Sequence, residues 1–144
     1  VSLPVHADVR ALLAVPNLEL STSQARGMLS DQVAFSAAVH NLSRTATLIA
    51  AMTVDPSLLL SGTDDQLHQE DRRPAYPQSM GLVDVLRAQG LAAVISGAGP
   101  TVLVLGTQAE VDRAAPLVSA HGFQPMHTGI SPDGAYVVAP GGAA

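Results

Sequence analysis

The chain of 144 residues contains no cysteine and no lysine. The lack of cysteine excludes disulfides, thiolate nucleophiles and cysteine-ligated metal sites, and it favours an intracellular location. The lack of lysine excludes a Walker A phosphate loop and Schiff-base chemistry, because both require a lysine amine. No stretch approaches the roughly 20 consecutive apolar residues of a membrane-spanning helix, and no basic start followed by an apolar run marks a signal peptide. We therefore expect a cytoplasmic protein without a membrane partner.

Charge of either sign is also scarce. Charged residues make up 13% of the chain, about half of the roughly 25% that is usual in globular domains. The seven basic residues are all arginine, and only Arg72 and Arg73 are adjacent, so the clustered cations of a nucleic-acid-binding surface are missing. The five histidines show no HxxxH or HxH spacing, which argues against a metal site. We expect neither a nucleic-acid partner nor a metal bound by this chain.

Hydrophobic periodicity and turn residues divide the chain into alternating strands and helices. We expect strands at 9–15, 91–95, 101–105, 123–128 and 135–138. We expect helices at 21–29, from Ser30 to just before Pro56, from Thr63 to Pro74, from Ser79 to Gln89 and from Thr107 to Gly122. This order predicts one α+β domain, a sheet with helices on one face.

The ends of the expected helices are set by local signals. These are N-cap residues at Ser30 and Ser79, capping boxes at Thr63–Gln66 and Thr107–Glu110, and glycines suited to a left-handed end at Gly90 and Gly122. Pro116 is expected to kink or split the last helix. In the longest helix, apolar residues recur at alternating spacings of four and three, which predicts an amphipathic helix. These residues are Phe35, Val39, Leu42, Ala46 and Ile49.

The first candidate for chemistry is a glycine-rich segment between two expected strands, made of Ser96, Gly97, Ala98, Gly99, Pro100 and Thr101. Its glycines permit positive φ and close approach of a ligand to the backbone. Successive amides can then form an anion-binding nest, with the hydroxyls of Ser96 and Thr101 as further donors. A hairpin turn that uses glycine only for geometry explains the same residues, and on this segment alone the hairpin turn is favoured.

Arg72 is the second candidate. It follows His68 by four residues, so both side chains can lie on one helix face. Arginine is suited to bidentate carboxylate binding, and an amino-acid substrate would supply that carboxylate. The alternative is a solvated surface arginine paired with Glu70 or Asp71, and residue type alone favours this alternative.

The third candidate is a polar stripe of His40, Asn41 and Arg44, which interrupts the otherwise apolar long helix. The three side chains can face one binding site, or they can form a solvated edge of the helix. The sequence leaves both interpretations open.

Taken together, these segments resemble one family. The stretch VISGAGPTV at 94–102 resembles the third motif of the GHMP small-molecule kinases, in the form typical of homoserine kinases. The residues LST at 20–22 resemble the strand-to-helix entry of those kinases, and LHQ at 67–69 ahead of Arg72 resembles their substrate-side arginine segment. The likeness extends from about residue 9 to residue 138.

The resemblance implies a fold and an activity. The fold is a ferredoxin-like antiparallel sheet with helices mainly on one face, in a C-terminal domain at 1–139 followed by a disordered tail at 140–144. The activity is transfer of the γ-phosphate of ATP to the hydroxyl of L-homoserine, which gives O-phospho-L-homoserine for threonine biosynthesis.

The resemblance also implies roles for the candidate residues. The loop from Ser96 to Thr101 would border the active site, and Arg72 would anchor the carboxylate of homoserine. Arg44, His40 and Asn41 would support the substrate side.

The chain departs from the family in its missing motifs. The PxxxGLGSSAA loop that wraps the ATP phosphates has no counterpart here, and neither does the first motif. Both belong to the N-terminal half of these kinases, so the resemblance implies a C-terminal half that leaves most contacts to ATP and Mg²⁺ to the other half. We expect the chain alone to be inactive, with no catalytic residue assigned to it, and the intact enzyme to be a homodimer.

Two other functions remain open. One is another GHMP kinase that shares the third motif but not the acceptor, against which His68 and Arg72 argue. The other is a non-catalytic regulatory module that binds an amino acid, which the missing ATP loop favours.

Overall fold

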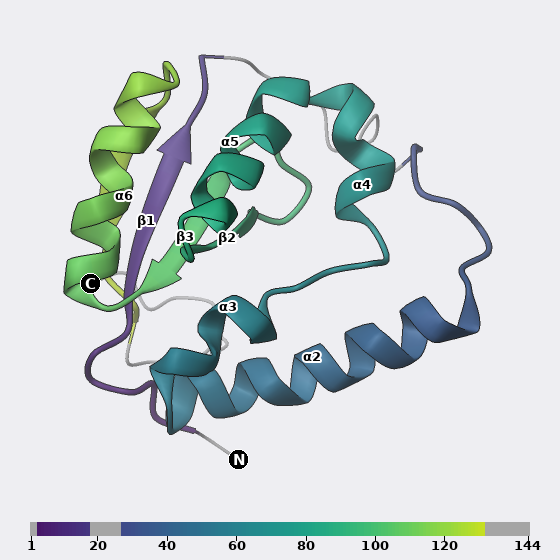
Figure 1. The fold of residues 1–144 in the computed structure, drawn as a ribbon, viewed down its shortest axis with the longest axis horizontal. Coiled ribbons are helices and arrows are strands. Elements are labelled where there is room, and N and C mark those ends of the chain that lie inside the picture. Colours follow the sequence, from purple (N-terminus) through teal and green to yellow (C-terminus); the bar gives the residue numbers. More distant parts are fainter. Residues whose placement is uncertain (1–2, 18–26, 132–144) are drawn as a thin grey trace, which may run out of the picture.

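A computed structural model describes residues 3–17 and 27–131. These residues form an α+β fold around one antiparallel sheet (Figure 1). The strands, in their spatial order, are β2 (Ala92–Ile95), β3 (Val102–Gly106), β1 (Arg10–Val15) and β4 (Gln124–Thr128). The helices are α2 (Phe35–Thr53), α3 (Leu59–Gly62), α4 (Gln69–Arg72), α5 (Pro77–Ala88) and α6 (Gln108–Ala120), with short 3-10 turns at η1 (Pro56–Leu58) and η2 (Arg73–Ala75). None of the described helices is long and apolar enough to cross a membrane.

Alternate residues of the central strands build the main core. Leu12 on β1 lies opposite Val104 on β3, and both side chains are completely buried. Side chains alternate between the two faces of a strand, so one face of the sheet presents a continuous apolar layer. The helices α5 and α6 cover that layer with residues such as Leu82 and Val111 (Figure 1). The expected sheet with helices mainly on one face is confirmed.

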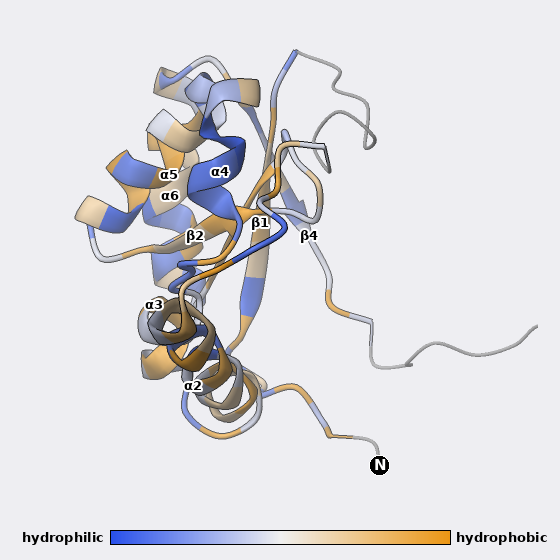
Figure 2. Ribbon diagram, turned by 90° about the vertical axis from the view of Figure 1, so that its right-hand side faces the viewer, coloured by the Kyte–Doolittle hydropathy of each residue, from blue (hydrophilic) through white to orange (hydrophobic). Residues whose placement is uncertain are grey.

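The helices α2 and α3 lie beyond the end of the sheet where β1 begins (Figure 2). A smaller core joins them to the sheet, and it consists of Val9, Ala51, Leu59 and Ala92. Figure 2 also shows α4 as a hydrophilic segment on the same side of the sheet as α5. The helix α4 contacts the end of the edge strand β2 through Gln69 and Ile95.

Several local signals are confirmed. Thr107 and Glu110 form the expected capping box of α6, and Gly90 and Gly122 have φ of 75° and 80°. The helix α6 continues through Pro116 without interruption, so the expected split is wrong. Pro116 lies on the exposed side, where water can satisfy the carbonyl that loses its amide partner.

The expected start of the long helix is wrong. The helix α2 begins at Phe35 rather than after Ser30, and its N-cap is Ala34. The hydroxyl of Ser30 donates 2.6 Å to the carbonyl of Gln32 and accepts the amide of the same residue. Such a local turn competes with a helical N-cap.

Two further N-caps are also wrong. Thr63 ends α3 rather than opening a helix, because its hydroxyl donates 2.8 Å to the carbonyl of Leu59. Ser79 lies inside α5 and donates 2.6 Å to the carbonyl of Pro100. In both cases the hydroxyl donates to a carbonyl oxygen instead of accepting a backbone amide at the start of a helix.

Some expectations fall outside the described residues. They concern the expected strand at 135–138, the tail at 140–144 and most of the expected helix at 21–29, of which residues 27–29 lie in a turn.

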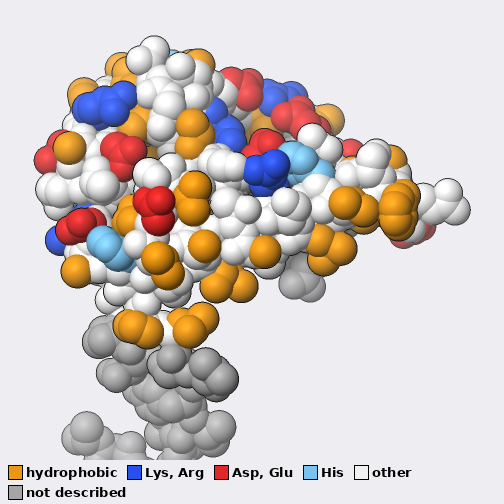
Figure 3. Space-filling model, turned by 60° about the horizontal axis from the view of Figure 1, so that its bottom comes forward, with side chains coloured by type: hydrophobic (Ala, Val, Ile, Leu, Met, Phe, Trp, Pro, Cys, Tyr) orange, Lys and Arg blue, Asp and Glu red, His pale blue; other side chains and the backbone are white. Residues whose placement is uncertain are grey.

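The apolar stripe of α2, made of Phe35, Val39, Leu42, Ala46 and Ile49, faces solvent. Phe35 is 85% exposed and Leu42 is 72% exposed. Figure 3 shows hydrophobic side chains along this face of the molecule. Periodicity predicts an amphipathic helix correctly, but it does not determine which face a neighbouring element covers. Here the covered face carries the polar residues His40, Asn41 and Arg44 in the first part of the helix, and Ala51 of the smaller core near its end.

Candidate functional site

The polar face of α2 contacts the segment that connects α3 to α4. The side-chain amide of Asn41 donates 2.7 Å to Asp65 Oδ1, and its Oδ1 accepts the backbone amide of Gln66 at 2.9 Å. His40 Nε2 lies 3.0 Å from Asp64 Oδ2. The predicted polar stripe is therefore a set of tertiary contacts that hold this segment, rather than a solvated helix edge.

Asp65 holds the start of α4. Its Oδ2 accepts the backbone amides of His68 and Gln69 at 3.0 and 2.9 Å, and its Oδ1 lies 3.3 Å from His68 Nε2. Burial raises the pKa of Asp65, but the hydrogen bonds from Gln69, His68 and Asn41 outweigh burial, so the pKa lies below its usual value. The N-cap position of α4 is His68, and the charged carboxylate of Asp65 accepts the first amides in place of the cap that was expected at Thr63.

Arg72 is buried against the glycine loop. Its residue is 8% exposed, and Nη1 lies 3.3 Å from the carbonyl oxygen of Gly97 and 3.4 Å from His68 Nδ1. The structure thus brings together two candidates, Arg72 and the Ser96–Thr101 loop, that the sequence offered separately. The expected neighbourhood of His68 and Arg72 is confirmed.

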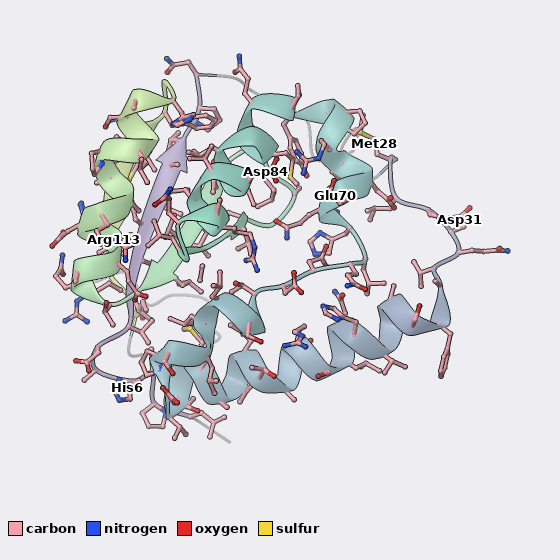
Figure 4. The ribbon with its side chains drawn as sticks, in the orientation of Figure 1. His6, Met28, Asp31, Glu70, Asp84 and Arg113 are labelled. Carbon is pink, nitrogen blue, oxygen red and sulfur yellow. The ribbon has the colours of Figure 1, made fainter. Side chains whose placement is uncertain are left out.

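The surface ion pair that was considered for Arg72 belongs to Arg73. Arg73 donates to both oxygens of Glu70 at 2.7 Å and to Asp84 at 2.8 Å. Figure 4 shows Glu70 and Asp84 near each other, on α4 and α5. The hydrogen bonds from Arg73 lower the pKa of Glu70.

The glycine loop is a hairpin turn with positive φ at both glycines, 59° at Gly97 and 82° at Gly99. The amide of Ser96 donates to the carbonyl of Thr101, and the amide of Gly99 donates to the carbonyl of Ser96. These two amides already donate hydrogen bonds inside the loop, so they are not available to bind an anion. The hairpin interpretation is therefore correct for the local geometry.

Tyr76 packs directly beneath this loop. A Cβ at Gly99 would lie 2.8 Å from Tyr76 Cε1, so glycine is required there for space as well as for φ. Within the part of the chain that the structure describes, the buried hydroxyl of Tyr76 has no partner in hydrogen-bonding geometry. Burial raises the pKa of Tyr76, and the neighbouring Arg72 partly offsets this effect.

Sequence reasoning missed four residues that support the site, namely Gln69, Tyr76, Ser79 and Arg87. Arg87 donates to the carbonyls of Leu60 and Ala93 at 3.0 and 3.3 Å and to the hydroxyl of Thr63 at 3.1 Å. It thereby joins α5 to the end of α3 and to β2. Their contacts include residues more than twenty positions away, such as Leu60 for Arg87 and Ile95 for Gln69, and for Gln69 the available signal was its place in the LHQ segment at 67–69.

Arg44 lies on the polar face of α2 and donates to the hydroxyl of Ser61 on α3. Among the described residues, the buried Nε of Arg44 has no hydrogen-bond partner. The hydrogen bond of Arg44 is to α3, whereas that of Arg72 is to the glycine loop. His40 and His68 lie against the carboxylates of Asp64 and Asp65, so the guanidinium groups of Arg44 and Arg72 are the candidates for binding an anion such as a carboxylate.

A family model for the C-terminal region of GHMP kinases matches residues 38–122, more than half of the chain. The chain belongs to the GHMP kinase C-terminal family. This assignment agrees with the resemblance of the loop segment, and the matched residues contain most of α2 together with α4 and the loop.

The most informative relatives are homoserine kinases. That of Rhodococcus erythropolis is 41% identical over 129 residues, which cover 90% of this chain and 41% of the relative. That of Streptomyces avermitilis is 52% identical over 103 residues, which cover 72% of this chain and 34% of the relative. The GHMP chain therefore spans less than half of the length of each relative.

Solved structures show the same fold. A homoserine kinase from Cytophaga hutchinsonii matches with a TM-score of 0.82 and 25% identity, over 92% of this chain and 45% of that one. A mevalonate pyrophosphate decarboxylase from Streptococcus pyogenes matches with a TM-score of 0.55 and 14% identity, over 92% of this chain and 48% of that one. The second match shows the fold alone.

Proposed function

We propose that this chain is the substrate-side, C-terminal domain of a homoserine kinase. The intact enzyme would transfer the γ-phosphate of ATP to the hydroxyl of L-homoserine and release O-phospho-L-homoserine for threonine biosynthesis. The similarity to homoserine kinases supports the proposal. The contact between Arg72 and Gly97 carries it, because this bond joins the substrate-side segment to the glycine loop.

In the proposed reaction, Arg72 holds the carboxylate of homoserine. A guanidinium group is planar and binds carboxylates through two parallel hydrogen bonds. Burial strengthens this attraction, because less water screens the two charges. An anchored carboxylate restricts the direction of the hydroxyl at the other end of the substrate, so Arg72 would contribute by orientation.

The other site residues would act around this anchor. Arg44 would supply a second positive charge on the substrate side, and His40 and Asn41 would hold the segment that leads into α4. The Ser96–Thr101 loop would border the transferred phosphoryl group, with its hydroxyls and the amides not engaged inside it as donors.

Among the described residues, no group of three or more His, Asp or Glu side chains could hold a metal ion. We propose that ATP and Mg²⁺ bind mainly to the N-terminal half of the intact enzyme, that this chain alone is inactive, and that the intact enzyme is a cytoplasmic homodimer.

The decisive experiment is phosphotransfer by the intact protein. Consumption of ATP should require L-homoserine, and Arg72→Ala should lower kcat/KM for homoserine by about 100-fold or more with little change in KM for ATP. Arg73→Ala is the matched control, and it should stay within about 2-fold of wild type because its ion pairs are exposed. Equal losses in both variants, or none in either, would contradict the role of Arg72.

Two further measurements separate the alternatives. A screen of acceptor alcohols with the intact protein would identify a different GHMP kinase, if another acceptor is preferred to homoserine. Calorimetry with homoserine or threonine on the 144-residue chain would reveal an amino-acid-binding module, if either ligand binds without the N-terminal half. Homoserine-dependent ATP consumption by the chain alone would contradict the proposal that the chain is inactive without the N-terminal half.

A further inference from the structure

The helix α4 is too short to hold its own position. It contains only the four residues Gln69–Arg72, and isolated helices of this length are not stable in water. Its orientation, and with it the direction of Arg72, must come from contacts with the rest of the chain.

Gln69 makes a buried contact with the edge of the sheet. The residue is 6% exposed, and its Oε1 accepts the backbone amide of Ile95 at 2.7 Å. Ile95 ends β2, which is an edge strand. An edge strand leaves backbone groups without a neighbouring strand, and here the side chain of Gln69 takes the place of that neighbour.

Gln69 and Arg72 contact the same stretch of backbone at two points. Gln69 bonds to Ile95, and Arg72 bonds to Gly97 two residues later. Gly97 lies in the turn that follows β2, and the long side chain of Arg72 reaches it from the last residue of α4. The bond at Ile95 therefore sets the position from which Arg72 reaches the loop.

The other anchors of α4 act at its ends. Arg73 joins Glu70 and Asp84 on the surface, where ion pairs contribute little free energy. Asp65 caps the first amides, at the end of α4 opposite Arg72. Gln69, the first residue of α4, supplies the buried bond between this helix and the sheet.

We propose that Gln69 is a positioning residue, which fixes α4 on β2 and so holds Arg72 at the place where the carboxylate of the acceptor binds. The identity of that ligand rests on the proposed function, whereas the position of Arg72 rests on the contacts alone. Gln69 acts through Arg72 and does not itself contact the substrate.

The first test measures the position of Arg72 without any substrate. Gln69→Leu keeps the approximate volume of the side chain and removes the acceptor. In the 144-residue chain, NMR hydrogen exchange should show the Ile95 amide and the Arg72 Nη1–H group, which contacts Gly97, exchanging about 10-fold or more faster than in wild type. Gln66→Leu, at an exposed position before α4, should leave both rates unchanged. Unchanged rates in Gln69→Leu would overturn the proposal.

Two additional variants keep this test decisive. Gln69→Glu retains an acceptor oxygen, so the exchange rates should stay near those of wild type. Gln69→Asn shortens the side chain by one methylene and should behave as Gln69→Leu does, which provides the same comparison if the leucine variant does not fold.

The second test measures catalysis by the intact protein. Gln69→Leu should raise KM for homoserine by about 10-fold or more, leave kcat and KM for ATP within about 2-fold, and be rescued by Gln69→Glu. A purely structural role would lower the active fraction, and hence kcat, without changing KM. If wild type does not phosphorylate homoserine, the proposed function fails while the exchange rates still decide the role of Gln69. Faster exchange without a change in KM would refute the positioning role.

Discussion

Arg72 and Arg73 are adjacent and chemically identical, yet their environments are opposite. Arg73 is held by Glu70 and Asp84 on the surface, whereas Arg72 is buried against Gly97. Successive residues of a helix point about 100° apart, so neighbours in sequence face different surroundings. The acidic residues beside Arg72 in the sequence indicated a surface ion pair for Arg72, but in the structure Arg73 forms the ion pair with Glu70.

Asp65 is a nearly buried carboxylate whose charge is held by donors from two helices. Asn41 reaches it from α2, and the amides of His68 and Gln69 reach it from the start of α4. These donors favour the ionised form, which explains why the pKa of Asp65 is lowered in spite of burial.

Asp65→Asn should therefore destabilise the fold by about 1–2 kcal/mol at neutral pH, because an amide satisfies fewer of these donors. The folded-state pKa lies below the unfolded value of about 3.9, so the stabilisation is present above that value and is lost as pH falls through the folded-state pKa. Urea unfolding at about pH 7 and about pH 3 should show the difference between wild type and variant shrinking in acid.

Asp31→Asn is the matched control for this experiment. Asp31 is exposed and projects from the segment before α2 (Figure 4), so its substitution should change stability by less than about 0.5 kcal/mol. A difference between wild type and Asp65→Asn that stays constant with pH would mean that the charge of Asp65 does not contribute.

At the scale of elements, α2 and α3 approach each other through a glycine. A Cβ at Gly62 would lie 2.8 Å from both the backbone nitrogen and the Cα of Leu48. Backbone atoms cannot move aside as a flexible side chain can, so any larger residue at Gly62 must push the two helices apart.

Gly62→Ala should destabilise the chain by about 1–3 kcal/mol, because the added methyl overpacks this contact. Gly81→Ala in α5 is a matched control, since a Cβ there meets no atom within 4 Å. That substitution should stabilise the chain by about 0.4–1 kcal/mol through the unfolded state. Chemical denaturation measures both effects, and a shift of the same sign in both variants would contradict the packing argument.

Elements with local signals could be predicted from the sequence. The hairpin of β2 and β3 is marked by two apolar runs around a glycine turn, and α6 is opened by a capping box at Thr107. The region between α3 and α5 could not be predicted in this way. One helix was expected from Thr63 to Pro74, whereas the structure has only the short helix α4 and the 3-10 turn η2 in this region. The segment before α4 is not helical, because Asp65 is held by Asn41 from a helix more than twenty residues earlier.

The candidate site was predictable as a set of parts but not as an arrangement. The motif resemblance identified Arg72 and the glycine loop, and their meeting at Gly97 depends on tertiary packing. Gln69 and Arg87 were missed for the same reason, because their partners are backbone groups of elements distant in sequence. No pattern of residue types reports such contacts.

At the scale of the whole molecule, apolar side chains are divided between two buried cores and the exposed stripe of α2. The residues that flank the stripe are small and uncharged, and they include Ser36, Ala38, Ser43 and Thr45. Soluble surfaces usually carry interspersed charges. The exposed stripe of α2 and its neighbours therefore form a stretch of surface with few charged side chains, and Figure 3 shows the hydrophobic side chains along this face.

Replacing Leu42 and Ile49 by serine should change the free energy of unfolding of the chain by no more than about 0.5 kcal/mol per substitution, because both side chains are already exposed. The same double variant should associate less with itself in sedimentation experiments. Leu82→Ala, at a completely buried position, should instead destabilise the chain by about 2–5 kcal/mol. A double variant as unstable as Leu82→Ala would show that the stripe is covered within the chain.

The central position of β1 has a consequence for the order of folding. This strand precedes the other described strands, and both of its partners, β3 and β4, lie far along the chain. Closing so long a loop has an entropic cost, and topologies with distant pairings fold slowly. During synthesis β1 leaves the ribosome before β3 and β4 and waits for these partners, whereas α2 and α3 need only each other to begin packing. The helical layer can therefore assemble on the nascent chain well before the sheet closes.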